Sequence, residues 1–89
     1  MVEQDVEIIN KLGLHARAAA TLVTTAGGYG ANISIAVGGK RADAKSIMEV
    51  MMLAATIGTV VRLSADGDDE EQALAAVVQL IDDRFGEPE

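Results

Sequence analysis

The chain of 89 residues contains no cysteine, one histidine and no apolar run long enough to span a bilayer. The lack of cysteine excludes disulfides, thiolate catalysis and zinc–thiolate sites. One histidine without any cysteine cannot complete a typical metal coordination shell, so we expect neither a metal nor another cofactor. The start of the chain shows no basic segment followed by an apolar one, which would indicate a signal peptide. We therefore expect a soluble, cytoplasmic protein.

Basic residues are also scarce. Lys and Arg number 7 against 14 Asp and Glu, which gives a formal net charge of −7. Nucleic-acid phosphates and acidic lipids would repel such a chain, so we expect no nucleic-acid partner and no membrane contact. The simplest role of the negative charge is solubility.

Hydrophobic periodicity predicts seven elements in one domain spanning residues 1–89. Alternation and a Gly-Gly hairpin signal predict strands over Val2–Ile9, Asn32–Val37, Lys40–Ala44 and Val60–Ala65. Helical spacing predicts helices over Ala16–Ala26, from Ile47 to about Leu53, and from a cap at Asp68 or Asp69 to Phe85. We expect a frayed tail after Gly86. This order indicates a two-layer α+β sandwich, with helices covering one face of a mostly antiparallel sheet.

His15 lies where a strand-like segment gives way to a helical one. A neutral imidazole can accept a phosphoryl group, and amides around Ala16 and Arg17 at a helix start would stabilise the anion. Arg17 could add charge-assisted hydrogen bonds of about 1.5–3 kcal/mol. His15 and Arg17 are thus candidate phosphoryl-transfer residues. From these residues alone, a structural histidine remains an equal alternative, whereas a hydrolase lacks a recognisable water-activating base.

The start of the second predicted helix combines a capping signal with an unusual apolar cluster. Ser46 and Glu49 match the capping-box pattern, in which the serine is worth about 1 kcal/mol as an N-cap. A phosphate on such a serine is electrostatically acceptable. Behind it, Ile47, Met48, Met51 and Met52 are too many apolar residues for one short helix to bury.

Two motifs in this chain resemble those of one family. Gly13-Leu14-His15-Ala16-Arg17 resembles the active-site motif of HPr, the histidine-containing phosphocarrier family of the bacterial phosphoenolpyruvate-dependent phosphotransferase system. Lys45-Ser46-Ile47-Met48 resembles the family's second signature, which contains a regulatory serine. The spacing of the motifs, the chain length and the order of elements agree. The resemblance covers roughly Val2 to Phe85.

The resemblance implies an open-faced sandwich with strand order 1-4-2-3 and three helices on one face. It implies a phosphocarrier rather than an enzyme, in which His15 accepts phosphate from enzyme I and passes it to a IIA domain. Arg17 would help to hold the phosphate, and an HPr kinase/phosphorylase could act on Ser46. By the same resemblance, partner contacts are expected at Leu14, Ile47, Met48 and Met51. We expect a monomer.

The chain departs from the family pattern at a few positions. Ala18 stands where most members have proline, and the positions that often carry lysine in sugar-system members are Thr24, Gly27 and Glu49. The site is therefore expected to be less rigid and less basic. A regulatory, nitrogen-type carrier and a signalling adaptor that depends on serine phosphorylation remain alternatives to a role in sugar uptake.

Overall fold

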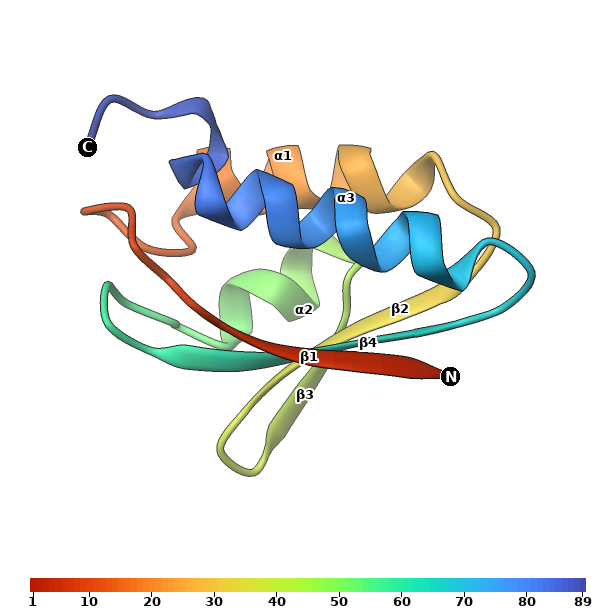
Figure 1. The fold of residues 1–89 in the computed structure, drawn as a ribbon. Helices are drawn as coiled ribbons and strands as arrows, with labels where there is room; N and C mark the ends of the chain where they lie inside the picture. Colours follow the sequence, from red (N-terminus) through yellow and green to blue (C-terminus); the bar gives the residue numbers. More distant parts are fainter.

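The computed structural model describes all 89 residues (Figure 1). Its elements are β1 Val2–Glu7, α1 Ala16–Gly27, β2 Asn32–Val37, β3 Lys40–Asp43, α2 Ile47–Met52, β4 Val60–Asp66, α3 Glu70–Asp82 and the 3₁₀ helix η1 Arg84–Gly86. Every predicted strand and helix is present, with small differences at the ends. None of the helices combines the length and the apolar character needed to cross a membrane.

The four strands form one antiparallel sheet in the order β1-β4-β2-β3, as the resemblance implied. In this register Val6 lies opposite Val61, and Ile35 lies opposite Leu63. Figure 1 shows the three helices on the same side of the sheet. The predicted α+β open-faced sandwich is thus confirmed.

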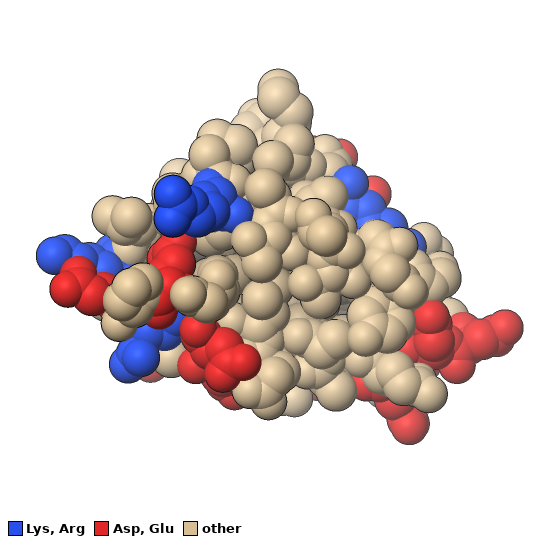
Figure 2. Space-filling model, turned by 90° about the horizontal axis from the view of Figure 1, so that it is seen from above, with Lys and Arg blue, Asp and Glu red and all other residues tan.

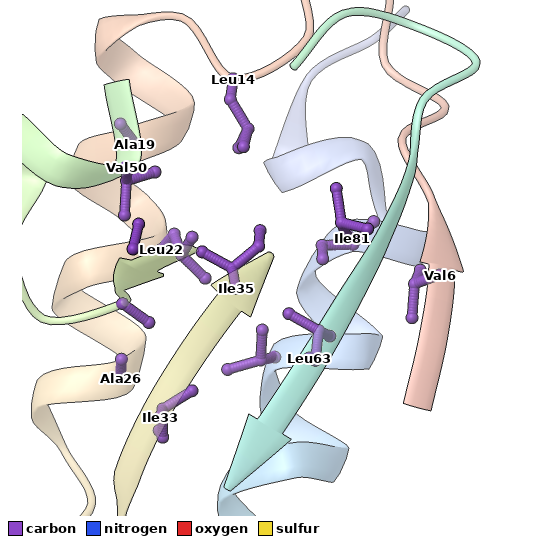
Figure 3. Packing of buried hydrophobic residues seen from close by; sticks show 14 of the residues in the cluster. Val6, Leu14, Ala19, Leu22, Ala26, Ile33, Ile35, Val50, Leu63 and Ile81 are labelled. Carbon is purple, nitrogen blue, oxygen red and sulfur yellow. The ribbon is translucent and has the colours of Figure 1, made fainter. Parts of the chain in front are cut away.

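The core lies between the sheet and the helices, where the inward residues of the strands meet the apolar faces of α1 and α3 (Figure 3). Helix α1 contributes small side chains, Ala18, Ala19 and Ala26, together with Leu22. Small residues let a helix lie close to its neighbours while it still buries apolar surface. This packing holds α1 in place and leaves its first turn at the molecular surface.

Ser46 is the N-cap of α2, as predicted. Its backbone is extended, and its Oγ accepts a hydrogen bond from the amide of Glu49 at 3.3 Å. The return bond of a capping box is absent, because the Glu49 carboxylate accepts from the amide of Asp43 at 3.0 Å. Glu49 therefore joins α2 to the end of β3.

Asp69 precedes α3, but its carboxylate does not cap that helix. It accepts instead from the amides of Gly30 and Ala31, at 2.9 and 2.8 Å. The bond from Gly30, with those from Ala31 and from its own amide, lowers the pKa of the Asp69 carboxyl below its ordinary value. Asp69, predicted as a helix cap, thus links the start of α3 to the loop that precedes β2 through these two hydrogen bonds.

The end of the chain differs from the expectation of one helix to Phe85 and a frayed tail. Helix α3 ends at Asp82, because Arg84 and Phe85 both adopt φ of 55°, which an α-helix cannot accommodate. Phe85 is buried at 6% exposure and anchors the turn. Beyond it, the carbonyl of Glu89 accepts a hydrogen bond from the amide of Lys11 at 3.1 Å. The tail therefore lies against the loop that follows β1.

Gly13 lies at the closest backbone approach in that loop. Its φ is +66°, and a Cβ atom at this position would lie 2.4 Å from the carbonyl oxygen of Ala55. The next amide, that of Leu14, donates to the same oxygen at 2.9 Å. Only glycine meets both requirements without moving the backbone.

We predict that Gly13→Ala lowers the free energy of unfolding by about 2 kcal/mol or more, because the change combines a clash with a strained φ. Gly27→Ala is the matched control. A Cβ at Gly27 meets nothing within 4 Å, so we expect a change within about 0.5 kcal/mol. Urea unfolding of both variants measures the difference, and equal stabilities would contradict the role assigned to Gly13.

Candidate functional site

The loop from β1 to α1 turns tightly before it reaches the histidine. Asn10 is fully buried, and its Nδ2 donates to the carbonyl of Gly13 at 2.8 Å, while the amide of Gly13 donates back to the carbonyl of Asn10 at 3.1 Å. Leu14 then points into the core at 4% exposure. The expectation that Leu14 contacts partners is therefore corrected, because its side chain packs in the core.

His15 is the N-cap residue of α1. Its backbone is extended, with φ of −73° and ψ of 177°, and its carbonyl accepts the helical hydrogen bond from Ala19 at 2.9 Å. The ring makes no capping bond to the helix, and the side chain is 27% exposed. The imidazole is therefore at the surface and at a helix start, as the sequence predicted.

The amides of Ala16 and Arg17 donate no hydrogen bond within the structure. Both residues are exposed, and no acidic side chain occupies the first turn of α1. Unpaired amides and the positive end of the helix dipole favour an anion at this place. The amide of Ala18 is also unpaired, but this residue is fully buried.

The guanidinium of Arg17 is exposed and forms no ion pair and no side-chain hydrogen bond. Arg17 and His15 line the same cavity, and the guanidinium has no existing contact to break when an anion enters it. Arg17 and the two free amides thus add positive potential around the ring.

Glu87 is a site residue that sequence reasoning missed. One oxygen of its carboxylate contacts Nε2 of His15, and the other accepts from Nδ2 of Asn10 at 2.9 Å. Burial of the Glu87 carboxyl would raise its pKa, but the hydrogen bonds from Asn10 and His15 and the attraction of His15 and Arg17 lower it overall. No local pattern could have revealed this contact, because 72 positions separate the two residues.

A cavity of about 680 Å³ opens at this place. It is lined by Lys11, Leu12, His15, Ala16, Arg17, Glu87, Pro88 and Glu89. Another depression, of about 560 Å³, lies beside β2, β3 and β4 and contains no histidine, so it is not the candidate site. No group of three or more His, Cys, Asp or Glu side chains in the molecule is arranged to hold a metal ion.

Helix α2 presents an apolar surface, which we call the α2 surface and define as Ile47, Met48, Met51 and Met52. These four side chains are between 39% and 71% exposed, whereas Val50 on the other side of the helix is fully buried. The expected exposure of Ile47, Met48 and Met51 is thus present, and Met52 joins them. The side of the molecule that carries α1 and α3, seen from above in Figure 2, has a broad area without charges between charged groups at either end.

The comparisons with known proteins agree on one family. The chain matches a family model described as the PTS HPr component phosphorylation site over residues 2–83. It is 53% identical to the phosphocarrier protein HPr of Cupriavidus necator over 89 residues, which cover all of both chains.

Two solved structures from Thermoanaerobacter tengcongensis are also similar. A crystal structure of HPr has a TM-score of 0.96 and 49% identity, with full coverage of both chains. An HPr dimer has a TM-score of 0.79 and 50% identity, with coverage of 98% of this chain and 100% of that chain. With this fold, these motifs and full-length identity near one half, the chain belongs to the HPr family of the phosphotransferase system.

Proposed function

We propose that the chain is a phosphoryl carrier that accepts a phosphoryl group on His15 and passes it on, without catalytic turnover of its own. The observation that carries this proposal is the placement of His15: a partly exposed imidazole at the start of α1, beside unpaired amides and the free guanidinium of Arg17. Membership of the HPr family supports the same conclusion.

The chemistry follows from these groups. A neutral imidazole is a good nucleophile near pH 7, because its ordinary pKa is about 6.5. The phosphoryl oxygens would accept hydrogen bonds from the amides of Ala16 and Arg17 and from the Arg17 guanidinium. Because phosphohistidine is a high-energy phosphoramidate, the group can be passed on as readily as it was received.

Enzyme I is the proposed donor and a IIA domain the proposed acceptor. We propose that both dock on the α2 surface, where Ile47, Met48 and Met51 are exposed. Methionine side chains are flexible and polarisable, so one such surface can adapt to several partners. Leu14 takes no part, since it is buried. No observation favours a nitrogen-type carrier or a signalling adaptor over this role.

We further propose that the protein acts as a monomer in the cytoplasm. All four strands pair with one another in one sheet of the same chain, and the buried apolar residues form one cluster. The related HPr dimer from Thermoanaerobacter tengcongensis shows that association occurs in a relative.

Ser46 is the proposed target of an HPr kinase/phosphorylase. It is half-buried at the start of α2, directly before Ile47 and Met48 of the α2 surface. The helix N-terminus would stabilise a phosphate at this position, and the phosphate would place about two negative charges beside the proposed docking surface. Partners that prefer positive charge at this surface would then bind less tightly.

For the acceptor residue, we predict that the wild type gains acid-labile label after incubation with enzyme I and labelled phosphoenolpyruvate. His15→Ala should gain none, because the chain has no other histidine. Ser46→Ala is the matched control and should be labelled like the wild type. Acid-labile label on His15→Ala would refute the proposed acceptor.

For the phosphate-binding residue, we predict that Arg17→Ala slows phosphoryl transfer from enzyme I by roughly 10- to 100-fold. This range corresponds to the loss of charge-assisted hydrogen bonds of about 1.5–3 kcal/mol. Arg41→Ala removes the same charge from β3 and should leave the rate near that of the wild type. Rapid-quench kinetics measures the rates, and equal rates for the two variants would contradict this role.

For the regulatory residue, we predict that Ser46→Asp weakens binding to enzyme I several-fold. Ser46→Ala should bind normally, although loss of the N-cap bond lowers its free energy of unfolding by about 1 kcal/mol. Isothermal titration calorimetry measures the affinity for enzyme I, and urea unfolding measures the stability of each variant separately. Equal affinities would show that charge at this position does not control docking.

A further inference from the structure

The Glu87 carboxylate is held between two fixed points of the site. Its Oε1 accepts from Nδ2 of Asn10, a fully buried residue whose Nδ2 also donates to the carbonyl of Gly13. Its Oε2 contacts Nε2 of His15, and the Glu87 side chain is only 10% exposed. Each oxygen therefore has one defined partner, and the partner on the loop side has no room to move.

The rest of the tail supports this placement. Phe85 is buried, and Gly86 adopts φ of +77°, which turns the chain back toward the loop. The amide of Glu87 donates to the carbonyl of Arg84 at 2.9 Å, and Lys11 is bonded to the backbone of Glu89. The backbone thus carries the carboxylate to the ring through several independent contacts.

An ionised carboxylate can only accept hydrogen bonds, so Nε2 of His15 must be the donor in this contact. In a neutral imidazole one nitrogen carries the proton and the other has the free lone pair, and the bond made by one nitrogen sets the state of the other. With the proton held on Nε2, the free lone pair lies on Nδ1.

We propose that Glu87 is a positioning residue for phosphoryl transfer, whose carboxylate holds the Nε2–H tautomer of His15 and so makes Nδ1 the acceptor of the phosphoryl group. This inference rests on the proposed function of the chain as a carrier. The family model ends at residue 83, so Glu87 lies outside the matched region.

In the transfer step, the Nδ1 lone pair forms a new bond to phosphorus, while the donor's bond to the same phosphorus breaks and leaves its electron pair on the donor. The proton stays on Nε2, so the ring gains a positive charge. The Glu87 carboxylate stabilises that charge as an ion pair. When the group is passed on, the electrons of the P–N bond return to Nδ1, and the neutral Nε2–H ring is restored.

The test reads the tautomer directly. Since His15 is the only histidine, a chain labelled with ¹⁵N-histidine gives a single set of ring signals in a long-range ¹H–¹⁵N spectrum. In the spectrum of the neutral ring, we expect the wild type to show Nε2 protonated and Nδ1 free. In Glu87→Ala the tautomer ratio should shift toward Nδ1–H by roughly tenfold, the bias expected from a hydrogen bond to a charged group.

Two further variants separate positioning from a purely structural role. Asp82→Ala removes an exposed carboxylate at the end of α3 and should keep the wild-type ring spectrum and transfer rate. Glu87→Gln keeps the size of the side chain, and its single acceptor oxygen can still accept from Nδ2 of Asn10. Its amide NH2 group, which is a donor, then faces Nε2 of His15, so the tautomer ratio should shift toward Nδ1–H as in Glu87→Ala. A purely structural role would leave the ring spectrum unchanged.

An unchanged tautomer ratio in Glu87→Ala would overturn the inference, as would a wild-type transfer rate in that variant. Failure of the proposed function looks different. In that case the wild type itself accepts no phosphoryl group from enzyme I, whereas the ring spectrum, which needs no donor, still reports on the contact with Glu87. The amide spectrum of each variant confirms that the core has folded.

Discussion

The backbone contact between the Gly13–Leu14 segment and Ala55 determines where His15 lies. The carbonyl of Ala55 accepts a hydrogen bond from the amide of Leu14, and Gly13 has no side chain that would hold the two segments apart. Leu14 is thereby drawn into the core, and the next residue, His15, lies at the surface as the N-cap of α1. A helix that is fixed along its buried alanine face then presents its unpaired first amides at a defined place. The site is thus set by backbone packing rather than by flexible side chains.

Groups of both charges surround the imidazole. Free amides and the Arg17 guanidinium favour an anion at the start of α1, whereas the carboxylate of Glu87 lies at Nε2 of the ring. A carrier needs both properties, because the cargo is negative while the ring that holds it becomes positive. One small site can thus stabilise both charges. The α2 surface lies on a different helix, so the proposed docking and the proposed transfer chemistry involve different side chains.

Local patterns in the sequence predicted what depends on local structure. Alternation placed the strands, and the serine–glutamate spacing identified the Ser46 cap, whose Oγ bond is present. The misses all involve partners that are distant in the sequence. Asp69 bonds to Gly30 and Ala31 rather than to its own helix. The tail was expected to fray, since no residue near Glu87 in the sequence indicates that its carboxylate contacts Asn10 and His15. Leu14 was assigned to the surface by resemblance, although its burial follows from the contact with Ala55.

A phosphoryl group on His15 is expected to rest on the start of α1. Amide ¹H–¹⁵N spectra of the chain, recorded before and after phosphorylation by enzyme I, test this placement. New hydrogen bonds to phosphoryl oxygens move amide signals strongly, so we expect the largest changes at Ala16 and Arg17. Only small changes at these two amides, with the largest shifts elsewhere in the chain, would contradict it.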